Sequence, residues 1–179
     1  MVATRHVTIE EFAAMPLQGI WELVDGEMIE LSPTADRSGW VSGRVFSRLE
    51  RFVDARHLGW AFPPETGFIL FSDRATVRSP DAAFVRFDRL RALSDGFVPV
   101  APDLAAEVLS PSDRMTDAMS KVTMYLAAGV RLVWLVDPAT LTVIVFRQDA
   151  APKTLEATDT LDGGDVLPGF SVPVAEIFA

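Results

Sequence analysis

Residues 102–125 have the sequence PDLAAEVLSPSDRMTDAMSKVTMY, and the rest of the chain can be placed around them. The apolar run from Leu104 to Leu109 predicts a buried strand, which the following Ser-Pro-Ser ends as a turn. A helix is predicted from 116 to 128, with Gly129 at its C-terminal cap. Glu107 interrupts the apolar strand. Because a buried carboxylate is costly unless it is paired or metal-bound, we expect chemistry at this strand.

A second apolar strand begins with an acid. Residues 81–85 follow Pro80, and Asp81 is the first of them. If this strand lies beside the one that carries Glu107, two carboxylates and the ammonium of Lys121 from the next helix make a compact metal site. The alternative is purely structural: Asp81 caps a turn, and Glu107 forms a buried ion pair with Lys121.

The N-terminal part predicts a short helix and a hairpin. Residues 8–11, Thr-Ile-Glu-Glu, form a capping box that opens a helix ending near Met15. Strands at 21–24 and 27–31 flank Asp-Gly, the typical dipeptide of a tight turn. Glu22 alternates along its strand with two apolar neighbours, so the pattern alone favours a solvent-facing glutamate.

A long amphipathic helix is predicted from 36 to 56. Its apolar residues recur at helical spacing, and arginines occupy much of the remainder. These are Arg44, Arg48, Arg51 and Arg56. Such a face either contacts a nucleic-acid backbone or is a solvated, charge-balanced face, and the second explanation is the more common.

The order of the elements predicts an α/β fold. Further strands are expected at 66–71, 132–136 and 142–146, and the turn-rich tail ends in a short apolar segment at 174–178. Antiparallel strands precede the second long helix, and a strand–helix–strand unit there suggests one parallel crossover. We therefore expect a mixed sheet with a helix on each face, in one domain that spans 1–179.

The composition narrows the class of protein. The 179 residues are 49% hydrophobic and 23% charged, which is typical of a soluble globular chain. A net charge of -9 disfavours a protein that holds nucleic acid through a broad basic surface, but not an enzyme that meets phosphates through a bound cation. Without cysteine there is no thiolate chemistry. Since the N-terminus lacks a signal-peptide pattern and no apolar run could span a membrane, we expect a cytoplasmic location.

Several motifs together resemble a known family. They are Trp-Glu-Leu-Val-Asp-Gly-Glu at 21–27, Arg-Ser-Pro-Asp at 78–81, Pro-Asp-Leu-Ala-Ala-Glu-Val-Leu-Ser-Pro-Ser at 102–112, Asp117, Lys121, Tyr125, Gly-Val at 129–130 and Trp-Leu-Val-Asp-Pro at 134–138. Their order and spacing resemble the Uma-type restriction endonuclease family of the PD-(D/E)xK nuclease superfamily. The resemblance covers nearly the whole chain and implies the restriction-endonuclease-like α-β-β-β-α-β core, here with an added N-terminal helix and hairpin.

The resemblance also implies a reaction and a site. The activity would be metal-dependent endonucleolytic hydrolysis of DNA phosphodiester bonds. Asp81 and Glu107 would hold Mg²⁺ or Mn²⁺, hard ions that take oxygen ligands, and the main-chain carbonyl of Val108 would supply another oxygen. Lys121 would orient the attacking water or stabilise the charged transition state. Glu22 would be an auxiliary acid that reaches the site through a water or pairs with Lys121.

The sequence departs from this pattern in two places. The superfamily lysine is expected two residues after the glutamate, where this chain has Leu109, and Lys121 of the following helix replaces it as in the Uma-type family. Many members also have a histidine near residues 38–40, which are Ser-Gly-Trp here. Asp117 would hold Lys121 by an i,i+4 contact. Tyr125 would either flank the site or simply pack.

Other functions remain open on sequence grounds. The net charge of -9 and the lack of an evident DNA-reading domain suit a catalytically inactive nuclease-fold module that serves in binding or assembly. Hydrolysis of another phosphate ester is a third candidate. DNA is the expected partner, and a homodimer would place two sites on the two strands. No residue of the sequence demonstrates that interface.

Overall fold

A computed structural model of the protein describes residues 6–179. Residues 1–5, part of the segment for which no signal peptide was predicted, lie outside the described residues. The helices are α1 (Ile9–Ala14), α2 (Asp36–Ala55), α3 (Met115–Ala127) and α4 (Val174–Phe178). The strands are β1 (Ile20–Val24), β2 (Glu27–Leu31), β3 (Gly59–Phe62), β4 (Phe68–Phe71), β5 (Thr76–Arg78), β6 (Ala82–Arg86), β7 (Leu104–Val108), β8 (Leu132–Asp137), β9 (Thr142–Arg147), β10 (Ala150–Leu155), β11 (Thr160–Gly163) and β12 (Leu167–Pro173).

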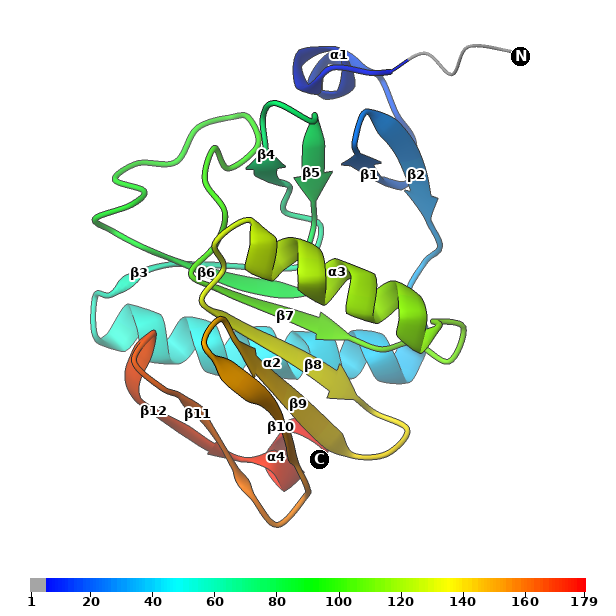
Figure 1. Ribbon diagram of the computed structural model, residues 1–179. Coiled ribbons are helices and arrows are strands. Elements are labelled where there is room, and N and C mark those ends of the chain that lie inside the picture. Colours follow the sequence, from blue (N-terminus) through cyan, green and yellow to red (C-terminus); the bar gives the residue numbers. More distant parts are fainter. Residues whose placement is uncertain (1–5) are drawn as a thin grey trace.

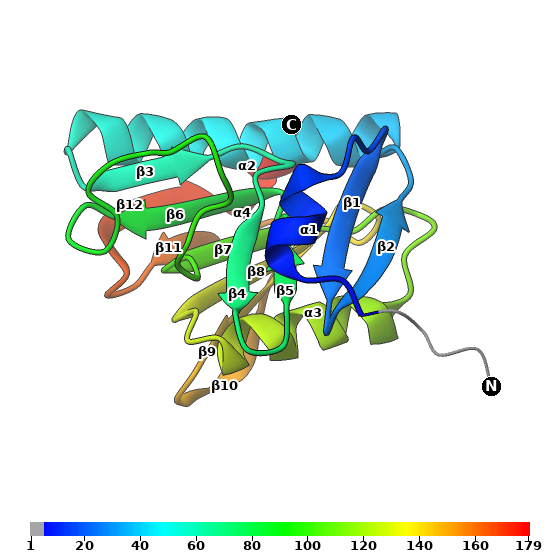
Figure 2. The same ribbon diagram turned by 90° about the horizontal axis from the view of Figure 1, so that it is seen from above.

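The centre of the molecule is a six-stranded mixed sheet in the order β10-β9-β8-β7-β6-β3. The β7–β8 pair is parallel and is joined through α3, as the strand–helix–strand pattern predicted; the other pairs are antiparallel. Helix α2 covers one face of this sheet and α3 the other (Figures 1 and 2). The predicted α/β class, a mixed sheet flanked by helices, is therefore confirmed.

Strand β7 is buried on both faces because both helices cover it. Leu104, Ala106 and Val108 pack into the core beneath α2, whereas Ala105 packs into the core beneath α3. Side chains alternate along a strand, so Glu107 lies on the α3 side with Ala105. This alternation places Glu107 within reach of the helix that carries Lys121.

A second, four-stranded sheet has the order β2-β1-β5-β4. The expected place of the strand at 66–71 in the central sheet is wrong: β4 pairs with β5, and β5 pairs with β1 of the N-terminal hairpin instead. The place beside β6 is taken by β3, which was not predicted. A Cβ on Gly59 would lie 2.1 Å from the Val85 carbonyl oxygen, so this close pairing requires a glycine there.

The C-terminal tail is more ordered than its turn-rich sequence indicated. It forms β10, the β11–β12 hairpin and α4, which packs against α2. Strand β10 lies at an edge of the central sheet and is exposed at all but its last residue, so no alternation of apolar residues revealed it. Within residues 6–179, no helix has the length and apolar character needed to cross a bilayer.

Candidate active site

Asp81 stands immediately before β6 and is tied to two other elements. Its Oδ2 accepts a hydrogen bond from the Val108 main-chain N–H at 2.7 Å, and its Oδ1 accepts one from Ser42 Oγ of α2 at 3.3 Å. The antiparallel register Ala82↔Ala106 brings Asp81 beside the end of β7. The carboxylate is thus held at the junction of β6, β7 and α2.

Glu107 receives both of its hydrogen bonds from α3. Lys121 Nζ donates to Oε2 at 2.9 Å, and Tyr125 Oη donates to Oε1 at 2.6 Å. The two donors are one helical turn apart, so they meet the same carboxylate from one face of the helix. Glu107 is 7% exposed and Tyr125 is fully buried. The structure therefore brings Glu107, Lys121 and Tyr125 into one network.

These groups open into one cavity of about 350 Å³. Asp81, Glu107, Val108 and Lys121 line it together with the end of β2, the loop that follows β2 and the loop that follows β7. The other lining residues are Glu30, Leu31, Ser32, Pro33, Thr34, Ser79, Ser110, Ser112 and Asp113. Its lining is largely polar, which suits a charged substrate and water more than an apolar ligand.

The charges of the cavity perturb one another. Burial, and after it the neighbouring charge of Glu107, raises the pKa of Asp81 from 3.8 to about 7, although hydrogen bonds from Val108 and Ser42 oppose this. For Lys121, burial lowers the pKa, but attraction to Glu107 and Glu22 outweighs it and holds the pKa above its ordinary value. Lys121 is therefore a stable cation, whereas Asp81 gains from a nearby positive charge.

The donors at this site fit a divalent cation with water ligands. Within residues 6–179, no three His, Cys, Asp or Glu side chains gather as a metal-binding group. Mg²⁺ nevertheless commonly binds through one or two carboxylates and keeps several waters. Asp81 and Glu107 supply two carboxylates. Because the N–H and C=O of a strand residue point to the same side, the Val108 carbonyl faces the side on which its N–H meets Asp81.

Glu22 is buried, so the solvent-facing interpretation was wrong. Strand β1 lies between β2 and β5 in the second sheet, and Glu22 is completely enclosed. Its partner is Arg78 Nη1 at 2.5 Å, with the Ser79 main-chain N–H at 2.8 Å, and not the expected Lys121. Glu22 still raises the pKa of Lys121 through its charge. It is thus an electrostatic neighbour of the cavity and not a wall of it.

Arg78 is the residue that the sequence interpretation missed. It is 7% exposed, and its Nε lies 3.5 Å from the Met124 sulfur while its other end pairs with Glu22. Arg78 is the last residue of the short strand β5, and no alternation of apolar residues around it predicted its burial. Its presence in the Arg-Ser-Pro-Asp motif was the available clue, since Asp81 follows three residues later.

Two smaller expectations have different outcomes. The i,i+4 contact between Asp117 and Lys121 is absent among the described residues, where Asp117 accepts a bond from Thr116 at 3.4 Å. This follows because Lys121 turns toward the sheet to meet Glu107. At residues 38–40, where the resemblance implied a histidine, Ser38 donates to the Leu109 carbonyl at 2.9 Å and so fixes α2 to the end of β7.

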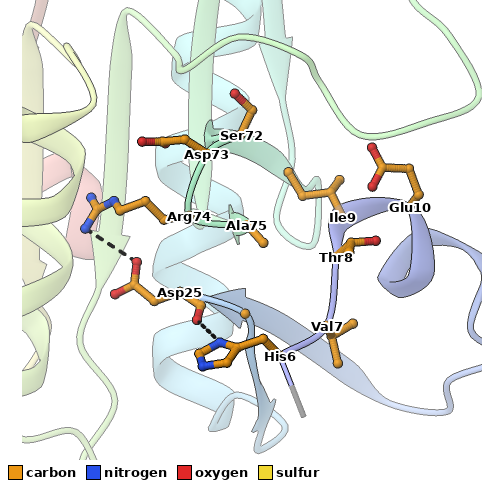
Figure 3. Close-up of a pocket in the computed structure, with 11 residues that line it drawn as sticks. His6, Val7, Thr8, Ile9, Glu10, Asp25, Ser72, Asp73, Arg74 and Ala75 are labelled. Atoms are coloured by element: carbon orange, nitrogen blue, oxygen red, sulfur yellow. Dashed lines mark hydrogen bonds and ion pairs between the residues drawn. The ribbon is translucent and has the colours of Figure 1, made fainter.

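A wider hollow of about 600 Å³ lies elsewhere, at the turn between β1 and β2 (Figure 3). There the His6 ring bonds the Asp25 carbonyl at 2.9 Å, and Arg74 pairs with the Asp25 carboxylate at 3.4 Å. Each of these three side chains is exposed. Because its charged groups are exposed and Arg74 is paired with Asp25, this hollow lacks the buried, convergent charges of the Asp81 cavity.

Comparisons with known proteins agree with this architecture. Residues 9–175 match the model of the Uma2 family, described as "Putative restriction endonuclease". Among solved structures, the chain is similar to a "putative nuclease belonging to DUF820" from Anabaena variabilis ATCC 29413, with a TM-score of 0.81 and 20% sequence identity. That similarity covers 96% of this chain and 97% of the other. No curated protein matches the chain.

Proposed function

The chain belongs to the Uma2 family, and we propose that it is a metal-dependent endodeoxyribonuclease that hydrolyses DNA phosphodiester bonds at the Asp81 cavity. The observation that carries this proposal is the convergence of Asp81 and Glu107, from adjacent strands, with Lys121 in one polar cavity. The two carboxylates repel each other when both are ionised, so they favour a bound cation, and the lysine beside them stays positively charged. Such an arrangement suits the transfer of a phosphoryl group.

Asp81, Glu107 and the Val108 carbonyl are the groups that would hold Mg²⁺ or Mn²⁺. When bound, such an ion polarises the phosphate and lowers the pKa of an attacking water. Hydrogen bonds within the protein already orient both carboxylates. Ser42 and the Val108 N–H orient Asp81, and Tyr125 orients Glu107 through a bond of 2.6 Å.

Lys121 supplies a fixed positive charge to the same cavity. Its Nζ lies 2.9 Å from Glu107, and its pKa stays above the ordinary value because Glu107 and Glu22 attract the proton. A lysine that remains protonated stabilises the negative charge that grows on the phosphate and does not act as a base. Glu22 contributes at a distance, by keeping Lys121 charged and in place.

A cleavage assay tests the proposal. We expect Mg²⁺- or Mn²⁺-dependent cutting of DNA by the wild-type protein and a loss of about 10³-fold or more in Asp81→Asn and Glu107→Gln. Asp88→Asn is the matched control, because this acid is exposed and pairs with Arg86 away from the cavity. Circular dichroism must show that all variants fold. Cleavage that survives both site substitutions would refute the assignment.

The net charge of -9 favours a second candidate, an inactive module of the same fold that binds or assembles, as in a homodimer. A thermal-shift titration with Mn²⁺ separates the two. A working site predicts stabilisation by Mn²⁺ that Glu107→Gln abolishes. An inactive module predicts no effect of Mn²⁺ and a gain in stability when Asp81 is neutralised.

A further inference from the structure

One side of α2 carries a row of basic residues that the site does not use. We call it the arginine stripe; it comprises Arg37, Trp40, Arg44, Arg48 and Arg51. Successive members are three or four residues apart, so they share one face of the helix. At 1.5 Å per residue, the stripe is about 21 Å long. The acids of the helix flank the stripe, because Asp36 is four residues before Trp40 and Asp54 is three residues after Arg51; the third acid is Glu50.

Most of the charge of the stripe is not neutralised. Arg48 pairs with the Glu176 carboxylate at 3.1 Å, and Arg44 donates to the Glu176 main-chain carbonyl, also at 3.1 Å. Arg37 and Arg51 are exposed, and neither joins an ion pair with another described residue. The excess of positive charge lies where Arg44, Arg48, Arg51 and Arg56 border one hollow whose lining has a single acid, Glu176, in a chain whose net charge is -9.

The stripe borders a hollow of about 530 Å³ between α2 and the C-terminal segment. Arg44, Arg48 and Arg51 line it on the helix side, and residues 170–172 and Glu176 line it on the other. A groove with guanidinium groups along one wall suits a chain of phosphates, because each arginine can donate two hydrogen bonds to one phosphate.

The buried face of the same helix contacts the catalytic site. Ser38, the neighbour of Arg37, donates to the Leu109 carbonyl, and Ser42 donates to Asp81. Trp40 is two residues from each serine, so it lies on the opposite, exposed side of the same end of α2. Helices α2 and α3 start at the same end of the central sheet (Figure 1), so their positive dipole ends both favour an anion there.

Trp40 adds a surface for stacking. Its side chain is 60% exposed, and the Arg44 guanidinium lies 5.8 Å from the ring centroid. Aromatic side chains interleaved with cations are typical of grooves that hold single-stranded nucleic acid, since every base offers a flat face.

We propose that the arginine stripe binds a DNA strand, with its phosphates along the arginines and an unpaired base stacked on Trp40 close to the cavity. This inference rests on the proposed function, from which the DNA substrate is taken, and it adds the path by which the strand enters. It also explains how an acidic protein holds a polyanion: four arginines border one hollow in which Glu176 is the single acid of the lining.

Binding measured without divalent metal tests the stripe apart from catalysis. Fluorescence anisotropy with a labelled single-stranded DNA gives the dissociation constant at several salt concentrations. For the double variant Arg37→Ala/Arg51→Ala we expect affinity about tenfold weaker and a log–log salt slope smaller by about 1.4, at 0.7 per lost phosphate contact. Arg91→Ala removes an exposed arginine outside α2 and should bind like the wild type.

Tryptophan fluorescence reports on the stacked base. Single-stranded DNA should quench the wild-type signal. Trp40→Phe should lose the quenching but keep the affinity, and Trp40→Ala should lose both, with binding about tenfold weaker. Fully paired duplex DNA should show the arginine effect without the quenching.

The outcomes separate this inference from the proposed function. If the arginine variant keeps the wild-type affinity and salt slope while Asp81-dependent cleavage is present, the stripe is overturned and the nuclease stands. If DNA binds with the expected slope and quenching but no DNA form is cut with Mn²⁺, the nuclease fails and the stripe stands. Absence of both effects overturns both.

Discussion

Two buried acid–base pairs lie near each other in this protein and differ in what they can do. Glu107–Lys121 joins β7 to α3 at 2.9 Å, and the lysine side chain is 24% exposed to the cavity. Glu22–Arg78 joins β1 to β5 at 2.5 Å, and its two side chains are 0% and 8% exposed. The chemistry of the partners is similar, but one pair is open to water and substrate while the other is sealed.

The difference teaches that access, more than charge, decides which of the two pairs a ligand could reach. A cation or phosphate that enters the cavity can compete for Glu107, because the carboxylate has free lone pairs facing that space. No such exchange is open to Glu22, whose oxygens are enclosed with Arg78 and the Ser79 N–H. The sealed pair joins two strands of the second sheet, and the charge of Glu22 raises the pKa of Lys121.

Breaking the sealed pair should have the largest effect on stability. Arg78→Met leaves Glu22 buried without a counter-charge and should lower the free energy of unfolding by about 3–5 kcal/mol. The double variant Glu22→Leu/Arg78→Met should recover most of that loss, because no charge is then stranded. Urea unfolding midpoints measure both. A single variant as stable as the wild type would show that water reaches Glu22.

Breaking the open pair should cost activity instead. Lys121→Met removes the fixed charge from the cavity and should lower the cleavage rate by about 10²–10³-fold, while Glu107 keeps its bond from Tyr125. Stability should fall less than in Arg78→Met, since the cavity lets water reach Glu107 when its partner is removed. The rate is measured with Mn²⁺ at saturation. Lys153→Met, an exposed lysine of β10, is the control.

Tyr125→Phe tests how much the orientation of Glu107 matters. It removes the 2.6 Å bond to Glu107 but keeps the ring in the core, so we expect activity to fall about 10–100-fold. The Mn²⁺ concentration for half-maximal rate should rise, which a packing defect alone would not cause. Burial, and after it the charge of Glu107, raises the pKa of Tyr125 well above its usual value. As the chain's one tyrosine, it should therefore ionise in alkali only on unfolding.

The smallest expected effect is on the pH dependence of the metal-free protein. Burial and Glu107 raise the pKa of Asp81 to about 7, so the folded state holds this proton more tightly than the unfolded state does. The stability that the proton confers is present below pH 4 and is lost as the pH rises through 7. Relative to Asp81→Asn, the wild type should lose about 1–2 kcal/mol over this window.

Thermal unfolding of both proteins between pH 4 and 8 measures that difference. Mn²⁺ should restore the wild type most strongly at pH 8, where it no longer competes with a proton on Asp81. A difference that is flat with pH would mean that Asp81 is ionised throughout.

Local patterns in the sequence were enough to place most elements of the central sheet and both long helices. These elements were predicted correctly from short-range patterns. The patterns are the apolar period of α2, the Asp-Gly turn of the hairpin, the apolar runs of β7 and β8, and the Gly129 cap. Asp81, Glu107 and Lys121 could be nominated because charged residues stand out within or beside apolar runs.

The burial of Glu22, the importance of Arg78 and the place of β4 and β5 in a second sheet depended on contacts between distant segments. Glu22 and Arg78 are 56 residues apart, and an alternating strand does not reveal which of its faces another layer will cover. The hydrogen bond between Glu107 and Tyr125 likewise depends on contact between separate elements, β7 and α3. Hydrophobic period and secondary-structure propensity are local properties of the sequence. The enclosure of Glu22–Arg78 and the opening of Glu107–Lys121 to the cavity arise only when the sheets and helices pack together.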